Sequence, residues 1–318
     1  MPAVLRGGEP TLREKRGPRR YFRANLEFTV MALPAMVLLL IFNYLPMAGI
    51  IIAFKRFRVN LGFFRSPWVG LQNFSFFFQS QDAWRITRNT LGYNALFIIL
   101  GLAISVTFAL LLFELTSRAI LKLYQTVFFF PYFLSWVVVG YVLYAFLSTD
   151  YGLANGLLRA LGKQPITWYI VPGYWPPILV FMNLWKTVGY FSVIYYAGLM
   201  GIDRELYEAC VIDGANKWQT ATRISVPLLS HLMVALVILQ IGRIFYADFG
   251  LFYNLPRDIG TLYPATDVID TYVFRSLRVT GDIGMSSAAN FYQAIVGFLL
   301  VLISNGVVRR LSPEHSLF

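Results

Sequence analysis

The sequence predicts an all-α membrane protein with six transmembrane helices, and three observations support this fold class. Of the 318 residues, 57% are hydrophobic and only 14% are charged, whereas a soluble domain carries about 25% charged residues. The hydrophobic residues gather in six blocks of about 20 residues or more, the length that crosses a bilayer as a helix. Polar and charged residues are concentrated between these blocks.

The six blocks define the expected domain organisation. We expect transmembrane helices over residues 28–54, 90–115, 126–147, 177–200, 228–252 and 288–308. Pro34 and Pro46 predict a kink or an early end in the first helix, and Pro131 lies near the start of the third. Residues 1–27 then form a basic tail, residues 28–310 the membrane domain, and residues 311–318 a second tail.

Basic residues indicate the orientation in the membrane. Seven Lys and Arg residues precede the first block, which places the N-terminus in the cytoplasm, and six spans return the C-terminus to the same side. Residues 19–27 mix cations with aromatic residues, which predicts either a short helix at the lipid surface or a solvated tail. The outer loop over residues 55–88 is also basic. It either faces an anionic partner or substrate or is simply tolerated.

Composition also limits the chemistry. The net charge of +11 is explained by membrane topology and anionic lipid, and the hydrophobic blocks argue against nucleic-acid binding. Cys210 is the only cysteine, and His231 and His315 have no metal-ligand spacing, so we expect no internal disulfide and no metal site. The spans contain no HExxH motif and no other convincing catalytic constellation. We therefore expect no catalytic residues, and an intramembrane enzyme is a weak alternative.

The longest polar segment in the second half covers residues 203–227. Asp203 is a plausible N-cap, and Glu205 lies in the first turn, where the helix dipole favours an acid. Tyr207, Val211, Gly214, Ala215 and Trp218 follow the spacing of one apolar helix face.

A turn and a second helix are expected within the same segment. Asp213-Gly214 predicts a helix stop, Asn216 with Gln219 predicts a cap for the second helix, and Pro227 suits the first turn of the fifth span. The segment therefore reads as a helix–turn–helix on the cytoplasmic face. It either transmits force from a soluble partner or is an ordinary amphipathic connector.

The residue order in this segment resembles the EAA loop of binding-protein-dependent ABC importer permeases. The family pattern is Glu-Ala-Ala, three residues, Gly, nine residues, Ile, one residue, and Leu-Pro. Every spacing matches, with Cys210 in place of the second Ala and Val226 in place of Leu. Residues 69–74 (VGLQNF), 89–91 (NTL) and 152–155 (GLAN) resemble the sugar-permease branch. The chain as a whole looks most like permeases for complex saccharides, including the alginate-importer type.

The resemblance implies the type I importer permease fold and a role for the loop over residues 201–227. In this family the loop forms a coupling helix that docks on a cytoplasmic ATPase. The residues at or beside the matched positions are Glu205, Glu208, Ala209, Cys210, Asp213, Gly214, Ala215, Ile224 and Pro227. The implied partners are a homologous second permease, two ATPase subunits, an extracytoplasmic solute-binding protein and the lipid bilayer of a bacterial inner membrane. This chain has no GxxxxGK[ST] motif, so ATP and Mg²⁺ would bind the ATPases and this chain would bind no cofactor.

Ionisable residues inside spans are candidates for the substrate path. Lys186 lies in the fourth expected span, and Arg243 and Asp248 lie in the fifth. They either form an internal ion pair, contact the second permease, or line a path for an anionic substrate, because Arg can hold a carboxylate bidentately. Trp185 and Tyr246 could stack on sugar rings. We therefore expect a permease for an oligosaccharide, acidic if these cations face the path. An ion-coupled carrier or channel is the alternative.

Overall fold

The computed structural model describes residues 18–79 and 81–311. Residues 1–17 and 312–318 of the predicted tails thus lie outside the described residues, whereas residues 18–27 belong to the first long helix. The chain divides into two units, residues 1–51 and residues 52–318. Within the described part all regular elements are helical, and a single isolated antiparallel bridge joins Lys55 to Trp68. Five helices are long and apolar enough to cross a membrane, and the number is six if one bent helix pair is counted as a span. The predicted all-α membrane fold class is confirmed.

The first unit holds one long helical segment. Helix α1 (Pro18–Leu39) passes through Pro34 without ending, and a π-turn, η1 (Leu40–Tyr44), leads to the short α2 (Leu45–Met47) and the 3₁₀ segment η2 (Ala48–Phe54). The wider turn accommodates Pro46, which has no N–H to donate. The expected irregularity is therefore present near Pro46 and absent at Pro34.

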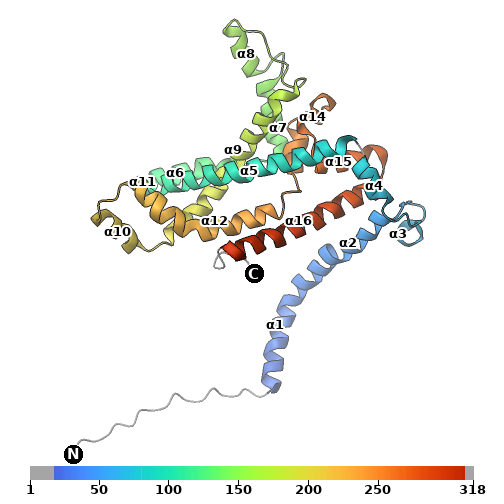
Figure 1. The fold of residues 1–318 in the computed structure, drawn as a ribbon, viewed down its shortest axis with the longest axis horizontal. Coiled ribbons are helices and arrows are strands. Elements are labelled where there is room, and N and C mark those ends of the chain that lie inside the picture. The colour runs from blue at the N-terminus through green and yellow to red at the C-terminus, as the bar shows by residue number, and fades with distance from the viewer. Residues whose placement is uncertain (1–17, 80, 312–318) are drawn as a thin grey trace, which may run out of the picture. The chain divides into compact units, whose positions relative to one another are not determined.

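Helices α5 (Gln81–Phe113) and α9 (Trp175–Met200) pack along each other at the centre of the second unit (Figure 1). Most of their residues are apolar, although α5 begins with a polar stretch and α9 carries Lys186. Gly189 of α9 lets α6 (Arg118–Phe129) approach, because a Cβ at this position would overlap the Phe128 carbonyl. Helices α12 (Val226–Ile241) and α16 (Ile283–Leu311) pack against each other and complete the bundle.

The third predicted span, residues 126–147, is not one helix. Helix α6 and the 3₁₀ turn η3 (Phe130–Phe133) end at Leu134, and α7 (Trp136–Leu147) restarts after a 97° bend. Pro131 begins η3 and Ser135 caps α7 by accepting a hydrogen bond from the Val138 N–H. A proline followed by an N-cap gives the chain both a stop and a new start, so the prediction of a continuous helix was wrong.

The fifth predicted span, residues 228–252, is also interrupted. Helix α12 ends at Ile241, residues 242–248 form turns and extended backbone, and α13 (Phe249–Asn254) follows. Arg243 and Asp248 therefore lie in a break between helices and not inside a helical span as predicted. The hydrophobic pattern could not reveal this break, because residues 242–248 are mostly apolar.

Short helices lie in the connections between the long helices: α3 (Gly62–Arg65), α4 (Gln72–Gln79), α8 (Leu153–Ala160), α14 (Tyr263–Thr266) and α15 (Ile269–Arg275). The buried Asp267 carboxylate joins two of them to α5. Its Oδ2 lies 2.7 Å from Arg275 and 3.4 Å from Arg85. Its Oδ1 accepts a hydrogen bond from Thr271. A buried carboxylate with two cations and a hydroxyl is fully satisfied.

Candidate functional site: a polar hairpin and a central cavity

The polar segment folds as two short helices, as the sequence predicts. Asp203 caps α10 (Arg204–Ile212) by accepting the Glu205 N–H at 3.1 Å. Gly214 ends the helix with φ +73°, the left-handed conformation that glycine adopts at little cost. Asn216 and Gln219 form a reciprocal capping box at the start of α11 (Lys217–Thr220). These three capping predictions are confirmed, as is Pro227 in the first turn of α12.

The predicted single apolar face is wrong, because the chain reverses between the two helices. Tyr207 is partly buried and packs on Phe113, with ring centroids 5.2 Å apart, and its hydroxyl lies 3.2 Å from Ser225. Val211 and Trp218 instead remain about three-quarters exposed. Tyr207 thus anchors the hairpin, while the other two side chains extend an apolar surface into solvent.

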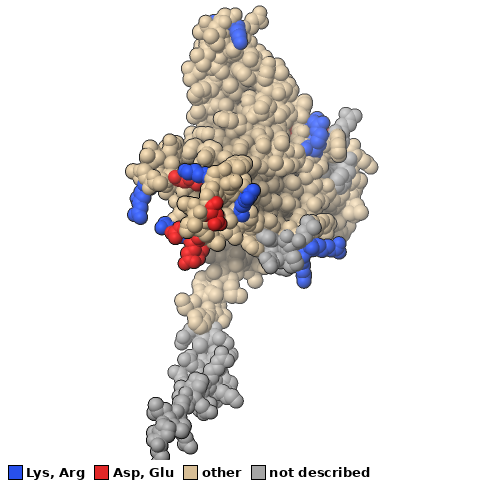
Figure 2. Space-filling view, turned by 60° about the vertical axis from the view of Figure 1, so that its left-hand side comes forward, with Lys and Arg blue, Asp and Glu red and all other residues tan. Residues whose placement is uncertain are grey.

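Charges of both signs surround this apolar surface. Acidic and basic side chains lie side by side over the α10–α11 end of the unit, while much of the remaining face is uncharged (Figure 2). Lys217 reaches Glu114 at the end of α5 with a 2.7 Å ion pair. Because both groups are exposed to solvent, the pair contributes little to stability. An exposed apolar centre with a charged rim is the usual composition of a protein–protein contact.

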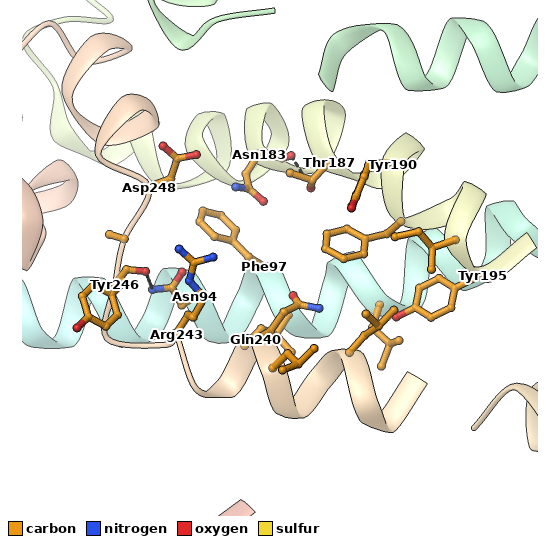
Figure 3. A pocket seen from close by; sticks show the side chains of 18 residues that line it. Asn94, Phe97, Asn183, Thr187, Tyr190, Tyr195, Gln240, Arg243, Tyr246 and Asp248 are labelled. Atoms are coloured by element: carbon orange, nitrogen blue, oxygen red, sulfur yellow. Dashed lines mark hydrogen bonds between the residues drawn. The ribbon is translucent and has the colours of Figure 1, made fainter. Parts of the chain in front are cut away.

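A cavity of about 710 Å³ lies between α5, α9 and the α12 end (Figure 3). Its volume is within the range of small-molecule sites, about 300–1,000 Å³. Apolar side chains line most of it. The polar or aromatic side chains in its wall are Asn94, Phe97, Asn183, Thr187, Tyr190, Phe191, Tyr195, Gln240, Arg243, Tyr246 and Asp248.

Three side chains from three helices hold the break at residues 242–248. Asn94 of α5 donates to the carbonyls of Ile244 and Tyr246 at 2.8 and 3.1 Å. Gln293 of α16 donates to the Phe245 carbonyl at 2.6 Å. Asp270 of α15 accepts the Ala247 N–H at 2.8 Å. Non-helical backbone at membrane depth is tolerated only where such groups satisfy it or where it lines a cavity, and this segment meets both conditions.

Two charged side chains of the break face the cavity. No described residue pairs with the Arg243 guanidinium by an ion pair or a side-chain hydrogen bond. The Asp248 carboxylate already has two hydrogen-bond partners. It accepts the Trp136 Nε1–H at 2.6 Å, and it caps α13 by accepting the Leu251 N–H at 3.2 Å. Tyr246 also lines the cavity (Figure 3). The structure thus brings together three of the five residues predicted for the substrate path.

The other two lie outside the cavity. Lys186 donates to the carbonyls of Leu134, Tyr132 and Pro131 at the bend between α6 and α7, and its Nζ lies 5.0 Å from the Trp136 ring. Its charge therefore satisfies the free carbonyls at a helix end. Trp185 is partly exposed and is not part of the cavity wall.

Sequence reasoning missed the uncharged polar residues Asn94, Asn183, Thr187 and Gln240 of the wall. Asn183, Thr187 and Tyr190 are spaced i, i+4 and i+7, which places them on one face of α9. Uncharged polar residues at helical spacing inside an apolar block were a usable signal, whereas Gln240 has no polar neighbour at that spacing in its helix.

Comparison with known proteins identifies relatives over most of the chain. The model of the family described as "Binding-protein-dependent transport system inner membrane component" matches residues 98–314. Protein LplB of Bacillus subtilis (strain 168) is 30% identical over 285 residues, covering 90% of this chain and 89% of that protein. The polygalacturonan/rhamnogalacturonan transport system permease protein YteP of the same organism is 31% identical over 90% of this chain and 88% of its own length.

Two solved structures have the same fold. The crystal structure of a bacterial ABC transporter involved in the import of the acidic polysaccharide alginate contains a chain that matches with a TM-score of 0.83 and 32% identity. The match covers 92% of this chain and 99% of that one. A second structure, of a bacterial alginate ABC transporter in complex with an alginate pentasaccharide-bound periplasmic protein, matches with a TM-score of 0.83 and 30% identity, over 93% and 98% of the two chains.

Proposed function

Because this chain belongs to the family of binding-protein-dependent transport system inner membrane components, we propose that it is the permease subunit of an ATP-driven importer for an acidic oligosaccharide. The substrate crosses through the cavity between α5, α9 and α12. The chain works in a bacterial inner membrane with both termini in the cytoplasm. A homologous second permease completes the path, and an extracytoplasmic binding protein delivers the substrate.

Arg243 in the cavity is the observation that carries the acidic specificity. An exposed guanidinium with no carboxylate partner is suited to hold a substrate carboxylate with two parallel hydrogen bonds. The amides of Asn183 and Gln240 can bond to sugar hydroxyls, and the Tyr190 ring offers a stacking face. Such a site combines an apolar lining with a few polar groups that fix orientation, as ligand sites generally do.

The relatives support this substrate class. One is named for polygalacturonan and rhamnogalacturonan transport, and two similar structures are of transporters for alginate, which is described as an acidic polysaccharide. A permease for an anionic chain benefits from an uncompensated cation in its path, whereas a permease for neutral sugars does not.

The hairpin α10–α11 is the proposed contact with the ATPase. Its exposed apolar centre and charged rim suit a protein partner, and its capped ends make it a rigid element. Phe113 and Ser225 receive Tyr207, so movement of the hairpin is passed to α5 and α12. ATP and Mg²⁺ bind the two ATPase subunits, and this chain supplies the path.

The proposal is tested with the whole complex in proteoliposomes. We expect a loaded binding protein to stimulate ATP hydrolysis and uptake of a galacturonate or mannuronate trisaccharide. Arg243→Gln should lower uptake about tenfold or more, since a charge-assisted hydrogen bond contributes about 1.5–3 kcal/mol. Asn183→Leu, which removes a proposed sugar contact from the same cavity without a change in charge, is the comparison and should lower uptake less, because a neutral hydrogen bond contributes about 0.5–1.5 kcal/mol. Equal losses in the two variants would contradict the acidic path, and ion-driven uptake by this chain alone would point to a secondary carrier.

A further inference from the structure

A second, smaller pocket of about 150 Å³ lies between α7 and α13. Its wall is formed by Val137, Gly140, Tyr141, Tyr253, Asn254 and Arg257, none of which lines the central cavity. The two helices come close at Gly140, where a Cβ would lie 2.8 Å from the Asn254 carbonyl oxygen. Tyr141 is two-thirds exposed at the rim. The site therefore combines aromatic rings, an amide and one guanidinium.

Arg257 carries an uncompensated charge in this pocket. Its guanidinium is centred 4.1 Å from the Tyr144 ring, and no described residue accepts a hydrogen bond or ion pair from it. The neighbouring Asp258 does not compensate it, because Asp258 Oδ1 is held by Arg275 at 3.2 Å and by the Tyr263 hydroxyl at 3.0 Å. The cation–π contact fixes one face of the guanidinium, and its edge stays available for a ligand.

A second cation, Arg278, lies beside Tyr253 of the pocket wall. Arg278 reaches the Tyr253 hydroxyl at 3.5 Å and lies 6.0 Å from the Phe274 ring, and it has no carboxylate within ion-pair distance among the described residues. Asp267 is already shared by Arg275 and Arg85. Asp258 and Asp267 are thus already paired, and Arg257 and Arg278 have no acid partner among the described residues.

The backbone at Arg257 is strained in a way that directs these charges. Arg257 and Asp258 have φ angles of +60° and +52°, and neither is glycine. A left-handed conformation is unfavourable for a residue with a Cβ, and such residues cluster at ligand sites. In this conformation the Asp258 side chain pairs with Arg275, whereas the Arg257 side chain points into the pocket and contacts the Tyr144 ring.

We propose that this pocket is a second acidic-sugar subsite, in which Arg257 binds the carboxylate of one uronate unit and the exposed Tyr141 stacks on its ring. The inference rests on the proposed import of an acidic oligosaccharide. Helix α13 starts after Asp248, which lines the central cavity, and ends at Asn254, which lines the pocket. Six residues of helix span about 9 Å, so nearby units of one oligosaccharide chain reach both sites.

The test uses the reconstituted complex and a galacturonate trisaccharide, with binding to the nanodisc-held complex and uptake as readouts. Arg257→Gln should weaken binding about tenfold, and Arg257→Lys, which keeps the charge but loses the planar fork, should weaken it less. Tyr141→Phe should be neutral and Tyr141→Ala should weaken binding severalfold, because stacking needs the ring and not the hydroxyl. Lys163→Gln, at an exposed cation outside the pocket, is the control and should change nothing.

The outcomes separate this inference from the proposed function. If Arg257→Gln behaves like Lys163→Gln while Arg243→Gln reduces uptake, the second subsite is refuted and the importer for acidic sugar stands. If the wild-type complex moves no acidic saccharide, both proposals fail. If Arg257→Gln releases the second permease from the purified complex, the pocket is a subunit contact and the subsite is refuted.

Discussion

The break at residues 242–248 should depend on Asn94, and Asn94→Leu is the perturbation that tests this. The Asn94 side chain donates to two carbonyls, those of Ile244 and Tyr246. Each lost bond reduces stability by about 0.5–1.5 kcal/mol, and a carbonyl left without a partner adds more where water cannot reach it. Both residues are partly exposed at the cavity, so we expect the total to be about 2 kcal/mol.

A local effect of that size has a measurable consequence. About 2 kcal/mol corresponds to a roughly 30-fold larger opening equilibrium. The amide hydrogens of Tyr246 and Ala247, which donate to the Arg243 carbonyl and to Asp270, should therefore lose about 30-fold in protection against hydrogen exchange. Mass spectrometry of the peptide covering residues 242–248, from the complex in nanodiscs, reports this directly.

The control is Asn183→Leu, which makes the same change of side chain on the opposite wall of the cavity. The Asn183 amide has no hydrogen bond to the backbone of the break among the described residues. Its variant should leave exchange in residues 242–248 unchanged. Similar exchange in both variants, or normal protection in Asn94→Leu, would refute the claim that this side chain holds the break.

Two further predictions concern the hairpin and the bend. Gly214→Ile places a β-branched residue at φ +73°. This variant and Glu208→Lys should each weaken co-purification and stimulation of the ATPase, while the chain still inserts in the membrane. Unchanged ATPase binding in both variants would rule out the docking role. Lys186→Met should reduce uptake of acidic and neutral saccharides alike, because Lys186 satisfies carbonyls at the bend. A selective loss for the acidic sugar, measured as the ratio of the two uptake rates, would instead return Lys186 to the substrate path.

Local chemistry made the hairpin predictable. An N-cap, a left-handed glycine and a capping box each need only residues within a few positions of one another, so Asp203, Gly214 and Asn216 could be placed from their neighbours alone. The reversal that separates Tyr207 from Trp218 could be expected from the same glycine. The exposure of Trp218 could not, since it depends on what the folded hairpin packs against.

The two interrupted spans show where hydrophobic pattern fails. A window of apolar residues measures transfer into lipid, and it carries no information on whether each carbonyl has a partner. The bend after Phe133 had a local signal, Pro131 followed by Ser135. The break after Ile241 had none, because its partners Asn94 and Gln293 lie about 150 residues before it and 50 after it in the chain.

Whether a charged residue in an apolar block already has a hydrogen-bond partner also decides which role it can have, and the sequence does not show this. Lys186 and Arg243 are equivalent in sequence: each is a cation in an apolar block. In the structure the Lys186 ammonium donates hydrogen bonds to three backbone carbonyls at a helix end. The Arg243 guanidinium lies in a break between helices and has no hydrogen-bond acceptor among the described residues. A charge that already satisfies the fold gains little from a substrate. A charge without a partner at membrane depth has an unfavourable energy until an anion binds it. This difference is why we propose the specificity role for Arg243 and not for Lys186.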